Sequence, residues 1–217
     1  MNKPLVILGS GGHAGVLIDL LRQQSRAILG LVSPENPPAS NLFENIPHFN
    51  SDEDILSFDK DSIKLVNGIG SLPGNNLRAI LFQRFTKLGY KFETVVADNA
   101  TVSTYAKLGQ GVQVMSGAII QTGAVVGANS IVNTGSIVEH DCNIGSDNHL
   151  APGVTISGQV KSSENVHFGT GASVIQSVIF GKNVVVGAGA TVTKDIPENT
   201  ICYPARITKK AIKTDGA

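Results

Sequence analysis

Cysteine, net charge and long apolar runs are what this sequence lacks, and each absence narrows the possible functions. It contains only two cysteines, Cys142 and Cys202, which lie far apart and form no Cys-x-x-Cys pair. We therefore expect no cysteine metal site, and a reducing cytoplasm fits. Lysine plus arginine balance aspartate plus glutamate at 17 each, which leaves no basic field for nucleic acid or an anionic membrane. The predicted partner is a small molecule.

The sequence also lacks a long apolar segment that could span a membrane. No uncharged apolar segment reaches the roughly 20 residues that a membrane-spanning helix requires. The apolar run at residues 5–8 is broken by Gly9, Gly11 and Gly12 and is followed by Asp19, so it predicts a strand rather than a signal peptide. A chain of 217 residues can bury a core without disulfides or metal. We expect a soluble protein with no membrane insertion.

A six-residue period is the strongest positive feature of the sequence. Fifteen of the sixteen positions reached in steps of six from Val102 to Val192 are apolar, and only Ser162 departs. A small or β-branched residue follows four residues later in most repeats, and glycine often follows directly. The pattern predicts short strands that place one bulky and one small side chain inside a coil, with glycine relieving the turn. Stacking of such coils predicts a parallel β-helix.

The same period resembles that of the hexapeptide-repeat acyltransferases. In those proteins three hexads close one triangular coil of about 18 residues, and the β-helix is left-handed. By this resemblance the hexads would form about five coils without an insertion. Residues about 18 apart would then lie above one another, separated by roughly 4.8 Å.

The first hundred residues lack this period and predict β-α-β units. An aliphatic strand at 5–8 passes through a glycine turn into a helix, and AILGLV and IKLVNGIGS predict two further strands. Residues 75–88 predict a second helix, and KFETVVA predicts a strand that leads into the first coil. We expect a small, doubly wound, Rossmann-like domain over residues 1–97 and a β-helix domain over residues 98–217.

Two glycine-rich turns suggest a nucleotide site in the first domain. GSGGHA, residues 9–14, lies between a strand and a helix, where backbone N–H groups can bind phosphate oxygens. NGIGS, residues 67–71, follows the third strand, so both turns would meet at the carboxyl ends of parallel strands. The acidic residue that would bind a dinucleotide ribose is missing, because GLVSPEN offers Val32 and Ser33, with Glu35 beyond. A nucleotide is favoured over a nicotinamide dinucleotide; alternatively, the glycines only allow close packing.

The segment VEHDCNIGSDNHLAPGVTISG, residues 138–158, predicts the chemistry. His140 lies near a coil corner, Asp141 could hold its imidazole tautomer, and Gly158 falls one coil above it. Acyl transfer to an amine or hydroxyl needs a base and a backbone N–H that meets the developing oxyanion. The alternative is that these histidines are solvated or structural.

Metal binding and cysteine chemistry are the rival interpretations. Of His140, His149 and His167, only the last two share a coil position, and two ligands are too few without a neighbouring subunit. We expect no metal. Cys142 takes a small inward position of its hexad, which predicts a core residue rather than a nucleophile.

The whole chain resembles a family of bacterial sugar O- and N-acyltransferases, in which a small nucleotide-binding domain precedes a left-handed β-helix. The resemblance rests on LGSGGHAG, NTGSIVEHDCNIGSDNHLAPG, VVVGAGATVTKDIP and YPARI. The most similar members N-acetylate UDP-4-amino-4,6-dideoxy-N-acetylhexosamine for bacillosamine-type sugars, and relatives act on GDP-perosamine or O-acetylate sialic acid. The resemblance implies acetyl-CoA as co-substrate and a homotrimer with sites between subunits.

The resemblance also implies roles for individual residues. It places the general base at His140, its acidic neighbour at Asp141, the oxyanion-binding amide at Gly158 and a second active-site histidine at His149. The implied co-substrate contacts are His149, Gly158, Thr170 and Ala188. The implied acceptor contacts are Gly9, Ser10, Gly11, Gly12, His13, Gly70 and Asn133.

Two segments depart from the family. VSPEN stands where relatives that bind UDP-sugars often carry consecutive aspartates, and in CYPARI Tyr203 stands where a glycine usually precedes the final PA of the coenzyme A segment. Neither departure touches the proposed chemistry. We expect a cytoplasmic, acetyl-CoA-dependent N-acetyltransferase of a nucleotide-activated amino sugar. The alternatives are an O-acetyltransferase of sialic acid or a related sugar and a non-catalytic, nucleotide-sugar-binding trimeric scaffold.

Overall fold

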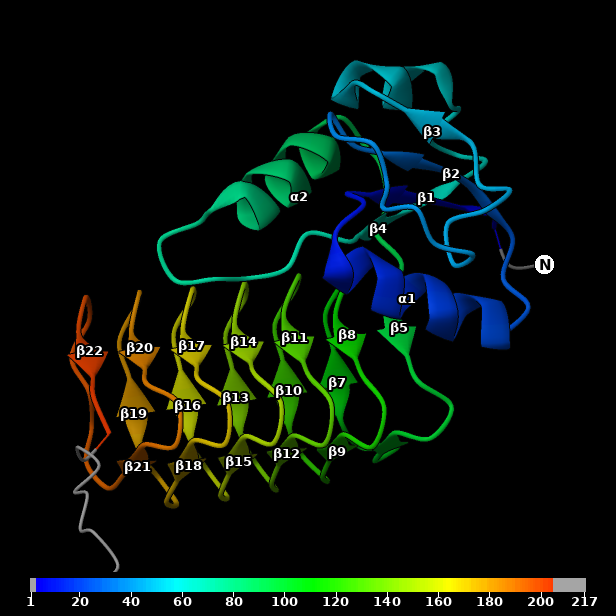
Figure 1. The fold of residues 1–217 in the computed structure, drawn as a ribbon. Helices are drawn as coiled ribbons and strands as arrows, with labels where there is room; N and C mark the ends of the chain where they lie inside the picture. The colour runs from blue at the N-terminus through cyan, green and yellow to red at the C-terminus, as the bar shows by residue number, and fades with distance from the viewer. Residues whose placement is uncertain (1–2, 205–217) are drawn as a thin grey trace, which may run out of the picture.

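The computed structural model describes residues 3–204 and shows an α/β domain followed by a parallel β-helix (Figure 1). The elements of the α/β domain are β1 (Leu5–Leu8), α1 (Gly12–Gln23), β2 (Ile28–Val32), β3 (His48–Phe49), the 3-10 helix η1 (Asp52–Ser57), β4 (Lys64–Asn67) and α2 (Leu77–Lys87). The four strands form one parallel sheet in the order β3-β2-β1-β4.

Both faces of this sheet are covered, as the doubly wound prediction requires. The whole of β1 is buried, which is typical of a central parallel strand. Helix α1 packs on one face through Leu17, Ile18 and Leu21. The other face is covered by η1 and α2, through Ile55 and Phe85. The predicted Rossmann-like domain is therefore confirmed.

Elements β3 and η1 were not predicted. Strand β3 has two residues and η1 has six, which is too short for a periodic apolar pattern to develop. The start of η1 does carry a local signal, because the Ser51 hydroxyl accepts from Glu53 N–H and the Asp54 carboxylate accepts from Ser51 N–H.

The strand order reverses at β1, which brings the two glycine turns together. The chain continues from β1 to β2 on one side, and β4 pairs on the other. Gly9 has φ +95°, and a Cβ placed on it would lie 2.7 Å from Ile69 Cδ1, so the turn after β1 touches the turn after β4. This is the switch point at which ligands bind in open α/β sheets.

The β-helix has three parallel faces built from two-residue strands. The seven-stranded face holds β5 (Val95–Val96), β8 (Gln113–Val114), β11 (Ile131–Val132), β14 (His149–Leu150), β17 (His167–Phe168), β20 (Val185–Val186) and β22 (Ile201–Cys202). The six-stranded face holds β6 (Thr101–Val102), β9 (Ile119–Ile120), β12 (Ile137–Val138), β15 (Thr155–Ile156), β18 (Ser173–Val174) and β21 (Thr191–Val192). The five-stranded face holds β7 (Lys107–Leu108), β10 (Val125–Val126), β13 (Asn143–Ile144), β16 (Lys161–Ser162) and β19 (Ile179–Phe180).

The pairing confirms the coil length. Ile131 pairs with His149 and Val132 with Leu150, so each coil contains three hexads. The strands of the three faces make six coils rather than the expected five. One reason is that β5 continues the period upstream of Val102, and the other is that β22 adds a last strand. That last coil is shortened, because Val185 pairs with Ile201 rather than with Tyr203.

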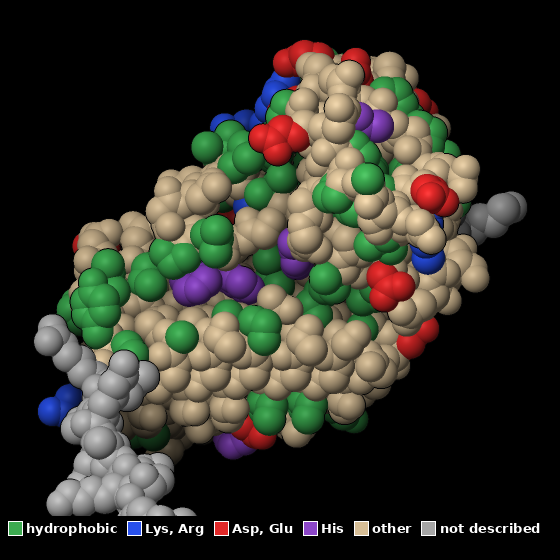
Figure 2. Space-filling model, viewed as in Figure 1, with side chains coloured by type: hydrophobic (Ala, Val, Ile, Leu, Met, Phe, Trp, Pro, Cys, Tyr) green, Lys and Arg blue, Asp and Glu red, His purple; other side chains and the backbone are tan. Residues whose placement is uncertain are grey.

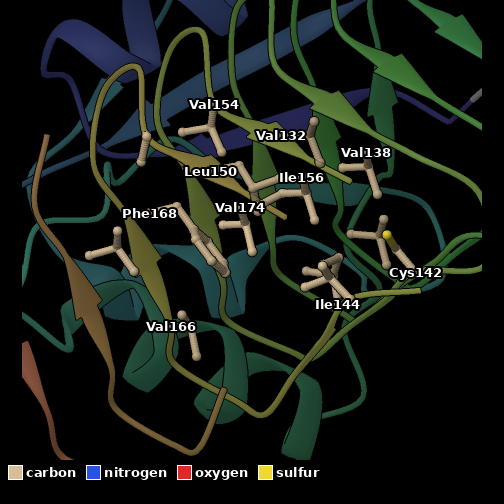
Figure 3. Packing of buried hydrophobic residues seen from close by; sticks show 14 of the residues in the cluster. Val132, Val138, Cys142, Ile144, Leu150, Val154, Ile156, Val166, Phe168 and Val174 are labelled. Atoms are coloured by element: carbon tan, nitrogen blue, oxygen red, sulfur yellow. The ribbon is translucent and has the colours of Figure 1, made fainter. Parts of the chain in front are cut away.

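The interior is filled as the repeat predicts (Figure 3). The second residue of a strand points inward, as Val138, Leu150 and Ile156 do, and these three side chains are completely buried. A smaller residue four positions later shares the interior; Cys142 is 1% exposed. Full burial of each such aliphatic side chain stabilises the fold by about 1.5–3 kcal/mol.

Ser162, the one exception to the period, belongs to a buried polar cluster. Its hydroxyl accepts a hydrogen bond of 2.6 Å from Asn148 Nδ2. Asn148 Oδ1 accepts from Val166 N–H at 2.6 Å, and Asn148 N–H donates to the Ser130 hydroxyl at 3.0 Å. These buried polar groups satisfy one another, so a polar residue at an apolar position is tolerated.

The expectation that glycine directly after the aliphatic residue relieves the turn is wrong. Gly127 does not have positive φ; a Cβ on it would lie 2.5 Å from the backbone carbon of Gly145 in the next coil. The left-handed residue of the turn comes two positions later in the hexad, as at Asn129 with φ 58° and Asp141 with φ 59°. These glycines are therefore required by the stacking of coils.

The α/β domain lies against the seven-stranded face (Figure 1). Residues of α1 share a core with Val95, Met115 and Ile131 of that face. The segment between β4 and α2 follows the same face toward the C-terminal coils. Within residues 3–204, neither α1 nor α2 has the length and apolarity needed to cross a bilayer.

Candidate active site

His140 and Asp141 form a hydrogen-bonded pair at the corner between the six-stranded and five-stranded faces. His140 Nδ1 lies 2.9 Å from Asp141 Oδ2, and both side chains are about half exposed, at 53% and 60%. Because a carboxylate accepts, Nδ1 carries the proton and donates it. The lone pair of Nε2 is then free to take a proton from a substrate.

Two glycines make room for this pair, one coil above and one coil below. A Cβ on Gly158 would lie 2.5 Å from His140 Nε2, so the imidazole rests directly on the backbone of residue 158. A Cβ on Gly123 would collide with Asp141 Oδ1. Among residues 3–204, the Gly158 N–H donates to no acceptor. The arrangement places an imidazole beside an unused backbone donor, as the coil spacing predicts.

His149 lies elsewhere, on the seven-stranded face under the loop that follows β4. Its Nδ1 donates to the Ser71 carbonyl oxygen at 3.0 Å, and its Nε2 accepts from Asn133 Nδ2 at 3.2 Å. Burial, with the neighbouring His167 second, lowers the pKa of His149 to about 3. His149 is therefore a neutral, fixed imidazole. The structure brings Asn133 to it but does not bring His140 to it within one chain.

His13 follows the first glycine turn and reaches the same groove. Its Nε2 lies 2.7 Å from Gln113 Oε1, and Gln113 Nε2 donates to the Asn67 carbonyl oxygen at 2.8 Å. These bonds make His13 Nε2 the donor. Burial, with the charge of Arg78 second, lowers the pKa of His13 to about 4. Gly70 of the second glycine turn lies against His13, since a Cβ on Gly70 would be 3.6 Å from His13 Cβ.

Figure 2 shows histidine side chains gathered in the groove between the α/β domain and the β-helix. His149 and His167 lie one above the other and meet edge to face, with ring centroids 5.0 Å apart, as their common coil position predicts. His167 Nδ1 is buried and has no hydrogen-bond partner within the described residues. Residues 3–204 contain no group of three or more His, Cys, Asp or Glu side chains placed to hold a metal ion.

The first glycine turn borders a cavity of about 320 Å³ at the carboxyl ends of β1 and β2. Gly9, Ser10, Gly11, Ser33 and Glu35 are among its lining residues. The Ser10 and Ser33 hydroxyls lie 2.9 Å apart, and both reach the Glu35 carbonyl oxygen. The turn is open as well, because a Cβ on Gly11, the N-cap of α1, would meet no atom within 4 Å. Gly12, the next residue, is equally open.

Thr170 and Ala188 lie one coil apart at the corner between the seven-stranded and six-stranded faces. Both are exposed. This corner is the opposite edge of the six-stranded face from His140, so one chain does not assemble all the implied co-substrate contacts. The C-terminal segment that the resemblance assigns to coenzyme A binding continues beyond Pro204, and that part, including Ala205 of the PARI motif, lies outside the described residues.

Cys142 is a core residue, as predicted. Its thiol donates to the Ser157 carbonyl oxygen at 3.1 Å, and burial raises its pKa to about 11. A protonated, buried thiol is inert as a nucleophile.

Three residues of these sites were not predicted from the sequence. Gly123 could have been found, since it precedes Asp141 by one coil of the repeat. Gln113 and Arg78 carried no local signal, because their partners are distant in the chain; Arg78 bonds Asn129, 51 residues away.

Comparison with known proteins agrees with this architecture. Residues 4–85 match the family model of the PglD N-terminal domain. The crystal structure of PerB from Caulobacter crescentus in complex with CoA and GDP-perosamine is 32% identical, with 91% of this chain and 92% of that chain covered and a TM-score of 0.82. The acetyltransferase domain of PglB from Neisseria gonorrhoeae in complex with acetyl coenzyme A is 29% identical, with coverages of 95% and 99% and a TM-score of 0.84.

Two further structures, of perosamine N-acetyltransferase from Caulobacter crescentus, carry a histidine replaced by asparagine or by alanine. No curated protein sequence matches the chain. The alignment with PerB covers more than nine-tenths of both chains, so it includes the β-helix as well as the α/β domain. The chain belongs to the PglD-like family of hexapeptide-repeat sugar N-acetyltransferases.

Proposed function

We propose that this enzyme transfers the acetyl group of acetyl-CoA to the 4-amino group of a nucleotide-activated amino sugar of the UDP-4-amino-4,6-dideoxy-N-acetylhexosamine type. The observation that carries the proposal is the corner at His140, where Asp141 holds Nδ1 and Gly158 offers an unused N–H beside Nε2. The relatives that bind CoA with GDP-perosamine, or acetyl coenzyme A, support the substrate class.

In the proposed reaction, His140 Nε2 removes a proton from the sugar amine as its nitrogen attacks the thioester carbonyl. The Asp141 carboxylate stabilises the imidazolium that forms, and the Gly158 N–H donates to the carbonyl oxygen as it becomes negative. When the carbon–sulfur bond breaks, His140 returns the proton to the sulfur, which leaves as the coenzyme A thiol. No covalent enzyme intermediate and no metal ion are required.

The two halves divide the substrates in this proposal. Residues 1–97 hold the nucleotide at the open glycine turn and the adjoining cavity, where the N-terminus of α1 favours phosphate. Residues 98–217 bind acetyl-CoA along the β-helix, with contacts at Gly158, Thr170 and Ala188. His149, the fourth co-substrate contact, and Asn133, an acceptor contact, are hydrogen-bonded to each other between the two halves.

A homotrimer would complete the site. The residues that point outward from the six-stranded face carry no charge; they are Thr101, Ile119, Ile137, Thr155, Ser173 and Thr191. The five-stranded face carries Lys107 and Lys161 at such positions, and the α/β domain occupies the seven-stranded face. A ring built on the uncharged face would bring the His140 corner of one subunit to the Thr170 corner of the next.

Mass spectrometry of a substrate panel tests the proposal. The panel contains UDP- and GDP-linked 4-amino sugars and sialic acid, each incubated with enzyme and acetyl-CoA while thiol release is followed. We expect one acetyl group on the amine of a nucleotide sugar. Acetylation of sialic acid alone would contradict the proposal and support the O-acetyltransferase alternative. Absence of thiol release with every acceptor would support the scaffold alternative; neither alternative is favoured by the relatives.

Acetyl-CoA and nucleotide sugars are cytoplasmic metabolites, so we expect the enzyme to act in the cytoplasm, in synthesis of a surface glycan or glycoprotein. Detection of the tagged protein in cell fractions would test this expectation.

A further inference from the structure

Arg78 is a buried cation held by backbone carbonyl groups. It lies in the first turn of α2 and is 4% exposed. Its Nη1 donates to the carbonyl oxygens of Asn67 at 2.9 Å and Ile69 at 2.7 Å, and its Nε donates to that of Asn129 at 3.0 Å. Two of these carbonyls belong to the second glycine turn and the third to the β-helix.

No carboxylate within residues 3–204 lies at ion-pair distance from this guanidinium. Burial lowers the pKa of Arg78 to about 9, with Asp147 as the charged group that opposes this effect. Its Nη2 is buried and has no hydrogen-bond partner among the described residues. An unpaired buried charge destabilises a fold, so stability alone does not explain an arginine here.

The contacts of Arg78 form part of a set that holds the second glycine turn from beneath. Gln113 Nε2 also donates to the Asn67 carbonyl oxygen, and His149 Nδ1 donates to that of Ser71. The carbonyls of residues 67, 69 and 71 are therefore all engaged by Arg78 or by the β-helix. The N–H of Gly70 makes no hydrogen bond in the described part of the chain, and residue 70 packs against His13 of the first turn, since a Cβ on it would lie 3.6 Å from His13 Cβ.

We propose that Arg78 is a positioning residue for acceptor binding, which fixes the second glycine turn so that the Gly70 N–H and His13 face the nucleotide sugar. This inference rests on the proposed function. The unneutralised charge of Arg78 lies at the base of the same turn and favours the diphosphate of the acceptor. Arg78 takes no part in the acetyl transfer step, which occurs at His140.

The test compares Arg78→Met and Arg78→Lys with the parent enzyme in steady-state kinetics. Arg78→Met removes the charge and three hydrogen bonds, so we expect the acceptor KM to rise about 10- to 100-fold. Arg78→Lys retains the charge but cannot span three carbonyls, and about a tenfold rise is expected. The kcat at saturating acceptor and the KM for acetyl-CoA should both stay within about threefold of the parent values.

Arg22→Met is the matched control. Arg22 also donates to two backbone carbonyls, those of Asn41 and Glu44, but it is exposed and lies outside the groove. This variant should keep the parental acceptor KM. An unchanged acceptor KM in Arg78→Met would overturn the proposal. An equal rise in the KM values for acceptor and for acetyl-CoA would assign Arg78 to stability alone and would also overturn the proposal. Loss of folding in both Arg78 variants would have the same meaning.

Failure of the proposed function would be recognised separately. If the parent enzyme releases no thiol with any amino sugar, isothermal titration with UDP and with GDP replaces kinetics. The parent should bind one of them, and Arg78→Met should lose that affinity while binding acetyl-CoA as the parent does. Equal nucleotide affinity of parent and variant, or no binding by the parent, would then overturn the role of Arg78.

Discussion

The corner at His140 and the groove at His149 are two histidine sites built in opposite ways. At the corner, a half-exposed imidazole is held by one carboxylate and rests on a glycine. In the groove, His13 and His149 are enclosed by amides and carbonyl groups, beside the buried charge of Arg78, and stay neutral. The first arrangement suits a group that must accept a proton, and the second suits groups that hold a shape. Exposure and partner chemistry, rather than residue type, separate a base from a binding residue.

Removal of the base is expected to have the largest effect. His140→Ala should lower kcat by roughly 10²- to 10⁴-fold, because general base catalysis is lost, while the thermal midpoint changes little. Asp141→Asn should give a smaller decrease, since it leaves the imidazole in place. Activity above half the parent rate in His140→Ala would remove the distinction between the two sites.

Acid should destabilise the groove. The pKa values of His13 and His149 are lowered on folding from the ordinary 6.5 to about 4 and about 3. The unfolded chain therefore binds more protons below pH 6.5, and stability is lost as pH falls from 6.5 through these lower values. Between pH 7 and pH 5 we expect a loss of about 2 kcal/mol per histidine in the free energy of unfolding.

Urea unfolding at the two pH values measures this loss. The variant His149→Gln should lose less stability between pH 7 and pH 5 than the parent, because one of the groove histidines whose pKa is lowered on folding is gone. Equal unfolding free energies of the parent at both values would mean that these histidines are not neutral and enclosed.

Gly158→Ala tests the stacking at the corner. The added methyl group would lie 2.5 Å from His140 Nε2 and displace the imidazole, so kcat should fall roughly 10- to 100-fold. In a His140→Ala background the same change should cost little further activity, because the displaced group is already absent. An additional large loss in that background would show that Gly158 matters only for the coil.

The smallest effect is expected at the open glycine turn. Gly11→Val adds a branched side chain where no atom lies within 4 Å of the Cβ position, so the fold should be retained while phosphate approach is blocked. We expect about a tenfold weaker acceptor affinity and an unchanged acetyl-CoA affinity in isothermal titration. Equal weakening of both would contradict the division of substrates between the domains, and an unaltered acceptor affinity would remove the nucleotide from this turn.

Much of the corner could be predicted from sequence, whereas the groove could not. His140 and Asp141 are adjacent, and Gly158 follows His140 by one coil, so the repeat places all three. Arg78, by contrast, acts on Asn129 and Asn67, and neither separation belongs to the hexad. The glycines that directly follow the aliphatic residues are an intermediate case. Their pattern could be recognised in the sequence, but they are required by the close approach of neighbouring coils and not by the turn.

By itself the sequence determined the coil. Each hexad pairs with its equivalent in the next coil, so the whole series of repeats specifies the same structure even where one hexad departs from the pattern. For the same reason, the sequence determined that His140 and Asp141 lie together at one corner of the coil. Only the tertiary structure decided that His149 receives Ser71 as a partner and that Arg78 is buried. The docking of the α/β domain is not periodic; it depends on single polar and apolar contacts between residues far apart in the chain, for which local pattern carries no signal.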